Sequence, residues 1–162
     1  MTVLSDDWFS VNLKQVIVGT GAAMNIAPPT KAQGIPTNAI VDSGTNSLVL
    51  SNTLFNAIVE HLTPAQRTAI SRVTVQTDSL NLAAWPTISF VLQGANGDVK
   101  LDVPPQNYWQ VDAIEQGVAR CSLVRTTTPQ SILGLPLMNG YFTIFDLEAN
   151  SGLGAVMFGQ PL

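Results

Sequence analysis

The amino-acid sequence predicts one mostly β domain, covering residues 1–162, with two short helices. Runs of β-branched and aromatic residues recur along the chain, and Gly, Pro, Asn and Asp interrupt them. Only the segment 51–72 changes to a helical period. Of the 162 residues, 46% are hydrophobic and 11% are charged, a composition that supports one substantial core. No linker, charge run or internal repeat divides the chain.

The first quarter of the chain moves from strand to loop and back to strand. Residues 8–19, WFSVNLKQVIVG, are aromatic and β-branched with partial alternation, which predicts strand structure ending at Gly19. Residues 22–38 contain three prolines and a glycine and predict an irregular loop. Residues 39–44, AIVDSG, predict a short buried strand that runs into a tight turn.

Two helix signals follow. In residues 51–62 the apolar side chains recur at helical spacing and form one face, and Ser51 or Asn52 is the candidate N-cap. Residues 63–72 carry Thr63 as N-cap and a proline at the first helical position, which predicts a second short helix.

The remainder of the chain returns to strand-like sequence. The predicted strands are residues 73–76, 87–93, 99–103, 107–113 and 119–125. Asn96 and Gly97 accept positive φ at low cost, so they predict a hairpin between the second and third of these strands. Residues 131–159 predict a buried strand, a short helical turn that contains proline, and a hairpin around residues 148–152.

Composition argues against several function classes. The seven Lys and Arg residues are scattered and the net charge is −4, so no basic stripe exists to bind nucleic acid. No apolar run approaches the roughly 20 residues of a membrane span. One His and one Cys cannot build a Cys/His zinc site within the chain, and we expect no metal. The start, MTVLSDDWF, lacks the basic and apolar regions of a signal peptide.

Asp42 stands apart from the other acidic residues, which lie near predicted turns, caps or polar faces. It follows the apolar end of a predicted buried strand, where an unpaired carboxylate is unfavourable. The hydroxyls of Ser43 and Thr45 can donate to this carboxylate, and Gly44 lets the backbone fold back onto it. Judged on residue types alone, a local turn in which Asp42 only caps its own loop explains the pattern equally well.

The rest of the sequence favours a catalytic role. The motif AIVDSGTNSLVL, the helix after it, and Ile132-Leu133-Gly134 far downstream resemble the C-terminal lobe of pepsin-family aspartic proteases. The family's terminal strand pair has its counterpart in Tyr141 to Asp146 and the glycines that follow. The resemblance covers about residues 8–159 and implies the single lobe of the pepsin-like fold, with orthogonally packed β-sheets in a closed, barrel-like arrangement.

The resemblance also implies roles for the residues of the motif. Asp42 corresponds to one of two catalytic aspartates, and Thr45 to the residue that hydrogen-bonds its outer oxygen. Ser43 corresponds to the residue whose hydroxyl crosses to the other lobe, and Gly44 to one whose backbone meets the bound peptide. Asn46 stands where the family usually has a Ser or Thr that contacts the substrate backbone, so the geometry of the subsites is open at this position.

Three apolar residues complete the implied site. Ile40, Ile132 and Leu133 would lie behind the two catalytic aspartates and line nearby substrate subsites. The implied activity is that of an aspartic endopeptidase, which hydrolyses a peptide substrate with no metal or organic cofactor. Members of the family are typically secreted, periplasmic or vacuolar.

The sequence holds one Asp-Ser/Thr-Gly motif, whereas the chemistry needs two carboxylates. Three arrangements are compatible with this. The chain is one half of a two-chain or truncated protease and pairs with a complementary N-terminal lobe; or two copies pair through a twofold axis; or the chain is a non-catalytic relative that binds partners. The motifs match the second lobe rather than an average of the two lobes, which favours the first arrangement.

The remaining singular residues have structural interpretations. Cys121 is predicted to be a buried thiol acting as a small hydrophobe, with an interchain disulfide as the alternative. His61 follows a predicted helix, where a cation complements the helix dipole. Trp8, Trp85 and Trp109 are predicted to lie in the core or at an interface between lobes.

Overall fold

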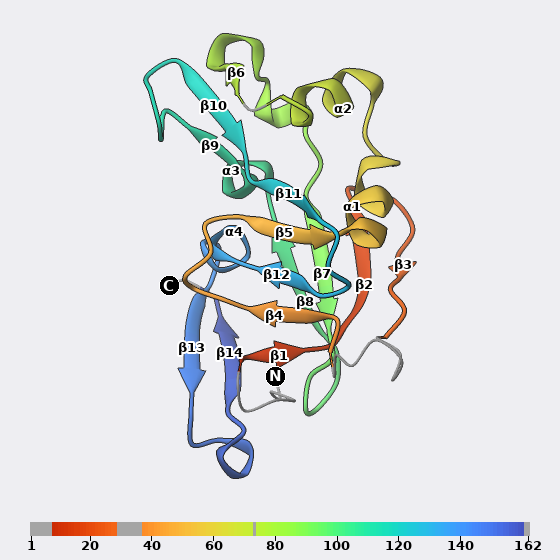
Figure 1. The fold of residues 1–162 in the computed structure, drawn as a ribbon, viewed down its shortest axis with the longest axis vertical. Helices are drawn as coiled ribbons and strands as arrows, with labels where there is room; N and C mark the ends of the chain where they lie inside the picture. The colour runs from red at the N-terminus through yellow and green to blue at the C-terminus, as the bar shows by residue number, and fades with distance from the viewer. Residues whose placement is uncertain (1–7, 29–36, 73, 161–162) are drawn as a thin grey trace.

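The computed structural model describes residues 8–28, 37–72 and 74–160 and shows a mostly β fold (Figure 1). Its strands form four separate sheets. The five-stranded sheet has the order β1 (Ser10–Val11), β4 (Ala39–Val41), β12 (Ser131–Leu133), β5 (Leu48–Ser51) and β11 (Leu123–Thr126). The four-stranded sheet has the order β3 (Met24–Asn25), β2 (Leu13–Val18), β7 (Ile88–Leu92) and β8 (Val99–Val103).

The two smaller sheets lie at opposite ends of the long axis (Figure 1). One consists of β6 (Val75–Gln76), β10 (Val118–Cys121) and β9 (Trp109–Val111), and the other of β13 (Phe142–Asp146) and β14 (Ala155–Gly159). The predicted mostly β class is confirmed. The closed, barrel-like arrangement is not found, because each sheet within the described ranges is open and keeps two edge strands.

The two predicted helices are confirmed as α1 (Asn52–Val59) and α2 (Pro64–Ile70). Ser51 caps α1 by accepting from the Leu54 amide. Thr63 and Gln66 form a capping box on α2, since each side chain accepts from the other residue's backbone amide.

Two further helices of one turn each lie within the described ranges. The turn α4 (Leu135–Met138) is the predicted one that contains proline. The turn α3 (Pro105–Tyr108) replaces the start of the strand predicted at 107–113, and β9 begins only at Trp109. Pro105 at the first helical position presets φ for a helical turn. Within the described residues, 3₁₀ turns lie at Thr77–Ser79, Leu82–Ala84 and Asn150–Gly152.

The strand predicted at 119–125 is two strands in different sheets. The chain leaves β10 at Cys121 and enters β11 at Leu123. Between them the Ser122 amide donates to the Tyr108 carbonyl, and its own carbonyl accepts from the Leu48 amide. Ser122 is therefore the residue at which the chain leaves the three-stranded sheet and enters the five-stranded sheet. The predicted loop at 22–38 contains the short strand β3, and its residues 29–36 lie outside the described part of the chain.

The insertion of β12 between β4 and β5 organises the centre of the fold. β12 runs parallel to β4 and antiparallel to β5. One face of these strands is fully packed into the core, with the buried side chains Val41, Leu48, Leu50 and Leu133. A late segment of the chain thereby lies directly beside the early motif around Asp42.

The three tryptophans have different environments. Trp85 and Trp109 are buried, and their rings pack edge to face with centroids 4.9 Å apart. Trp8 is exposed, so its prediction as a core residue is wrong, and its place at an interface between lobes stays a prediction. No helix within the described ranges has the length and apolar character needed to cross a membrane.

The buried state of Cys121 is confirmed, and we expect its thiol to be inert in the native protein. Burial raises the pKa of the Cys121 thiol to about 12 from its usual value of 9.0. The unfolded chain therefore loses this proton first as the pH rises. We expect the free energy of unfolding to fall above about pH 9, by up to about 1.4 kcal/mol per pH unit from this group.

Urea unfolding of the wild type and Cys121→Ala between pH 8 and 11 measures this contribution. The difference between the two proteins should shrink as the pH rises. In parallel, an aromatic disulfide reagent at pH 8 should label the native thiol far more slowly than the denatured one. Rapid labelling of native protein would contradict the buried environment.

Candidate active site

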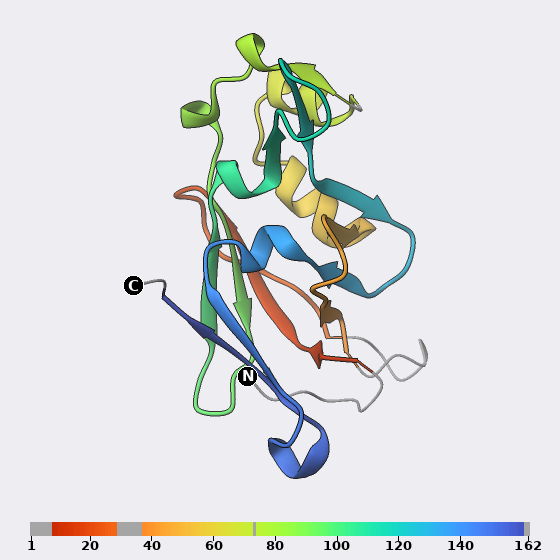
Figure 2. The same ribbon diagram turned by 90° about the vertical axis from the view of Figure 1, so that its left-hand side faces the viewer.

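The loop between β4 and β5 carries Asp42, and backbone hydrogen bonds hold it on two sides. The Asp42 amide donates to the carbonyl of Leu133 at the end of β12, at 3.2 Å. The Leu135 amide, at the start of α4, donates to the carbonyl of Thr45 at 2.8 Å. The loop is thus fixed to the β12–α4 connection. It lies on the same side of the molecule as the β13–β14 hairpin, which is the left side in Figure 1 and the near side in Figure 2.

Both carboxylate oxygens of Asp42 accept hydrogen bonds from its own loop. The Gly44 amide donates to Oδ1 at 2.8 Å, and the Thr45 hydroxyl donates to Oδ2 at 2.5 Å. The first bond is the local turn that residue type alone already suggested. The second fixes the plane of the carboxylate and leaves the half-buried side chain oriented at the end of the strand. Such donors stabilise a carboxylate away from bulk water.

Gly134 permits the close approach of the two segments that form the site. A Cβ atom at this position would overlap the carbonyl oxygens of Thr45 and Ser47. At Gly44 an added Cβ would lie 3.2 Å from Asp42 Oδ1, a tight contact. The glycine of the 132–134 element is therefore required because two backbones meet there, which spacing in the sequence does not reveal.

Ser43 and Asn46 lie on the exposed side of the loop. The Ser43 hydroxyl makes no hydrogen bond to any residue that the structure describes, Asp42 included, although the sequence allowed such a bond. The Asn46 carbonyl accepts from Gln110 Nε2 at 3.1 Å, and its side-chain oxygen accepts from Ser47 Oγ at 3.2 Å. The Ser43 hydroxyl and the Asn46 amide group thus face outward.

The three apolar residues of the implied site differ in burial. Ile40 and Ile132 are direct cross-strand partners on β4 and β12, and both are half-buried. Leu133 is fully buried and packs into the core. In this chain Leu133 supports the Asp42 loop from inside, whereas Ile40 and Ile132 share the opposite face of the sheet.

A cleft of about 750 Å³ adjoins the Asp42 loop, and no pattern in the sequence predicts it. Asn46 from the loop, Leu135 from α4, and Trp109, Gln110 and Arg120 from the β9–β10 hairpin line it. Asn46 belongs to the Asp42 motif, but no motif marks the three hairpin residues, because the pairing of Arg120 with Gln110 across two strands brings them to the site.

Among the described residues, Asp42 supplies the carboxylate of the site, and no Asp or Glu lines the cleft beside it. None of their His, Cys, Asp and Glu side chains form a group of three or more that could hold a metal ion. The geometry provides a single carboxylate held by two donors, beside an open cleft.

A family model described as eukaryotic aspartyl protease matches residues 1–156 of the chain. The match includes the Asp42 loop, the β12–α4 connection and the β9–β10 hairpin.

Proposed function

The chain belongs to the eukaryotic aspartyl protease family, and from this membership we propose that it is one lobe of an aspartic endopeptidase, the lobe that supplies Asp42. At the level of the family, its function is that of an aspartic-type peptidase domain. The observation that carries the finer proposal is the carboxylate of Asp42, fixed by the Gly44 amide and the Thr45 hydroxyl at the end of a buried strand.

The proposed reaction needs a second carboxylate from another Asp-bearing lobe. Two carboxyl groups in contact share one proton, because both cannot ionise easily. The ionised group takes a proton from a bound water while the water oxygen attacks the peptide carbonyl carbon. The protonated group gives its proton to the carbonyl oxygen. The tetrahedral intermediate then collapses as the C–N bond breaks. The carboxyl group that took the water proton gives it to the leaving nitrogen, and the other carboxylate takes a proton from one hydroxyl of the intermediate.

The neighbours of Asp42 have separate roles in this proposal. The exposed Ser43 hydroxyl bonds to the partner lobe, and the Gly44 backbone and the Asn46 amide group meet the backbone of the peptide substrate. Ile40 and Ile132 lie behind the two aspartates, and the buried Leu133 holds the loop in place. No metal or organic cofactor takes part.

The β13–β14 hairpin supports the proposal of a partner lobe. Its inner face packs on the body, where Phe145 contacts Phe9 edge to face with centroids 4.8 Å apart. Its outer face carries Phe142, Ile144 and Met157, which are 67%, 43% and 43% exposed. Their register places them on one side of the two-stranded sheet. An exposed apolar face of this kind is typical of a surface that another subunit covers.

We propose that this face binds a complementary N-terminal lobe, which brings the second aspartate beside Asp42. A second copy of the chain is the alternative partner. The hairpin also suits a non-catalytic module that uses the fold only for association, so an activity measurement must separate the two functions.

A peptide-cleavage assay at pH 3–6, with and without a complementary N-terminal lobe, tests the proposed function. We expect cleavage only with the added lobe, because one carboxyl group cannot serve as both acid and base. Phe142→Asp should weaken assembly and cleavage together, while Thr143→Ser on the inner face of the hairpin serves as the matched control. Assembly without cleavage, and without binding of a statine-type inhibitor, would favour the non-catalytic module. Cleavage by the chain alone, rising with the square of its concentration, would favour self-pairing.

A further inference from the structure

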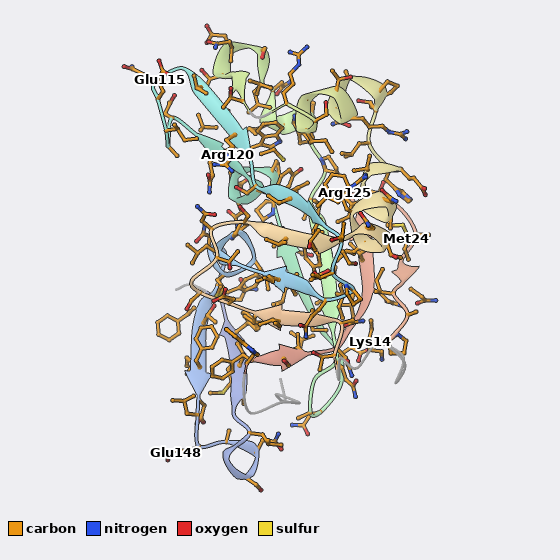
Figure 3. All side chains as sticks on the ribbon, viewed as in Figure 1. Lys14, Met24, Glu115, Arg120, Arg125 and Glu148 are labelled. Carbon is orange, nitrogen blue, oxygen red and sulfur yellow. The ribbon has the colours of Figure 1, made fainter. Side chains whose placement is uncertain are left out.

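The cleft beside the Asp42 loop contains one charged side chain, that of Arg120. Its other lining residues are neutral, and no carboxylate is among them. Figure 3 labels Arg120 on β10 and Glu115 at the tip of the same hairpin. Both ion pairs within the described ranges, Lys14–Asp98 and Lys100–Asp102, involve other residues. The guanidinium therefore lacks a carboxylate partner in this part of the chain.

Strand pairing places this charge close to the candidate catalytic loop. Arg120 is the cross-strand partner of Gln110, so their side chains share one face of the β9–β10 hairpin. Gln110 in turn donates to the carbonyl of Asn46, four residues after Asp42. Arg120 is thus the strand neighbour of the residue whose side chain contacts the Asp42 loop.

Two further donors at this cleft lack acceptors. The indole Nε1 of Trp109, whose side chain is 2% exposed, and the amide nitrogen of Asn107 are buried without a hydrogen-bond partner among the described residues. Buried donors without acceptors are rare, and both side chains are among the residues that line the cleft. The Arg120 guanidinium and these donor-bearing side chains give the cleft a positive lining without a carboxylate, which favours a ligand with negative charge.

We propose that this cleft is a substrate subsite that binds an acidic side chain, and that Arg120 selects Glu or Asp at one position of the peptide. The proposal rests on the proposed function, because it takes the bound acid to be part of the peptide that Asp42 acts on. The apolar side chains of Leu135 and Ile114 at the cleft suit the methylene stem of a glutamate. The guanidinium can bind its carboxylate through two parallel hydrogen bonds.

The first test uses the protease assembled with a complementary lobe and a set of peptides. In each peptide one position on either side of the cleaved bond is Glu or Gln, and kcat/KM is measured for both. At one position we expect a Glu/Gln ratio of about five, the size typical of a partly exposed ion pair. Arg120→Gln should bring this ratio to about one, and Arg120→Glu should bring it below one.

Arg125→Gln is the matched control, because it removes the same charge from β11, the next strand along the chain. Arg125 donates to Asn56 and covers the Phe55 ring outside the cleft, and Figure 3 shows it on β11. This variant should keep the Glu/Gln ratio of the wild type. A ratio that is the same in the wild type and Arg120→Gln at every position would overturn the inference while the proposed function stands.

A binding experiment separates failure of the inference from failure of the proposed function. If no assembly cleaves any peptide, the chain is titrated with Ac-Ala-Glu-Ala-NH₂ and with its Gln counterpart, and the three indole N–H signals are followed by NMR. The signal of Trp109, assigned with Trp109→Phe, should shift with the Glu peptide, and less with the Gln peptide or in Arg120→Gln. Equal responses to both peptides, or none, would overturn the acidic subsite.

Discussion

Asp42→Asn is expected to reduce kcat/KM of the assembled protease by on the order of 10³-fold or more. The asparagine side chain has nearly the same shape, and its oxygen can still accept from the Gly44 amide, as Asp42 Oδ1 does at 2.8 Å. It cannot take a proton from water or share one with a second carboxyl group. The variant therefore keeps the loop and loses the chemistry.

The measurement is peptide cleavage at pH 3–6 with thermal unfolding of the same samples. Asp98→Asn is the matched control, since Asp98 makes only an exposed ion pair with Lys14 and such pairs contribute little. The control should keep its activity, and both variants should unfold near the wild-type temperature. Full activity of Asp42→Asn would remove Asp42 as the catalyst. A large loss of stability would instead assign it the role of a structural turn residue.

The parts of the structure that local chemistry determines could be predicted from the sequence. The cap residues Ser51 and Thr63 act on amides within three residues of themselves, so the starts of α1 and α2 follow from local sequence. The same holds for the Asp42 loop, where Gly44 and Thr45 are two and three residues from the carboxylate they contact. A spacing rule describes such contacts because the chain itself brings the groups together.

Features that depend on distant parts of the chain could not be predicted in this way. The strand predicted at 119–125 breaks at Ser122 because its backbone bonds to Tyr108 and Leu48 of other elements. The cleft beside Asp42 depends on the register that pairs Arg120 with Gln110. Hydrophobic periodicity and strand propensity each describe one segment of sequence at a time. Neither can therefore predict which segments pair with each other.

Gly134 lies where the β12–α4 connection meets the backbone of the Asp42 loop. Gly134→Ala is expected to destabilise the protein by about 3 kcal/mol or more. The added methyl group would overlap the backbone oxygens of Thr45 and Ser47, and neither can rotate away as a side chain would. Relief requires β12 and the Asp42 loop to separate. That movement would break the bonds from the Leu135 amide to Thr45 and from the Asp42 amide to Leu133.

Urea unfolding measures the loss, and Gly159→Ala is the matched control. At Gly159 the added carbon would lie 3.8 Å from the nearest atom, an ordinary contact, so this variant should be within about 0.5 kcal/mol of the wild type. Unchanged stability of Gly134→Ala would show that the two segments can move apart at little cost. The catalytic carboxylate would then be fixed by Gly44 and Thr45 alone, and the β12–α4 connection would have no part in positioning it. A loss of both stability and cleavage would instead show that the closely packed backbones hold Asp42 in place for the reaction.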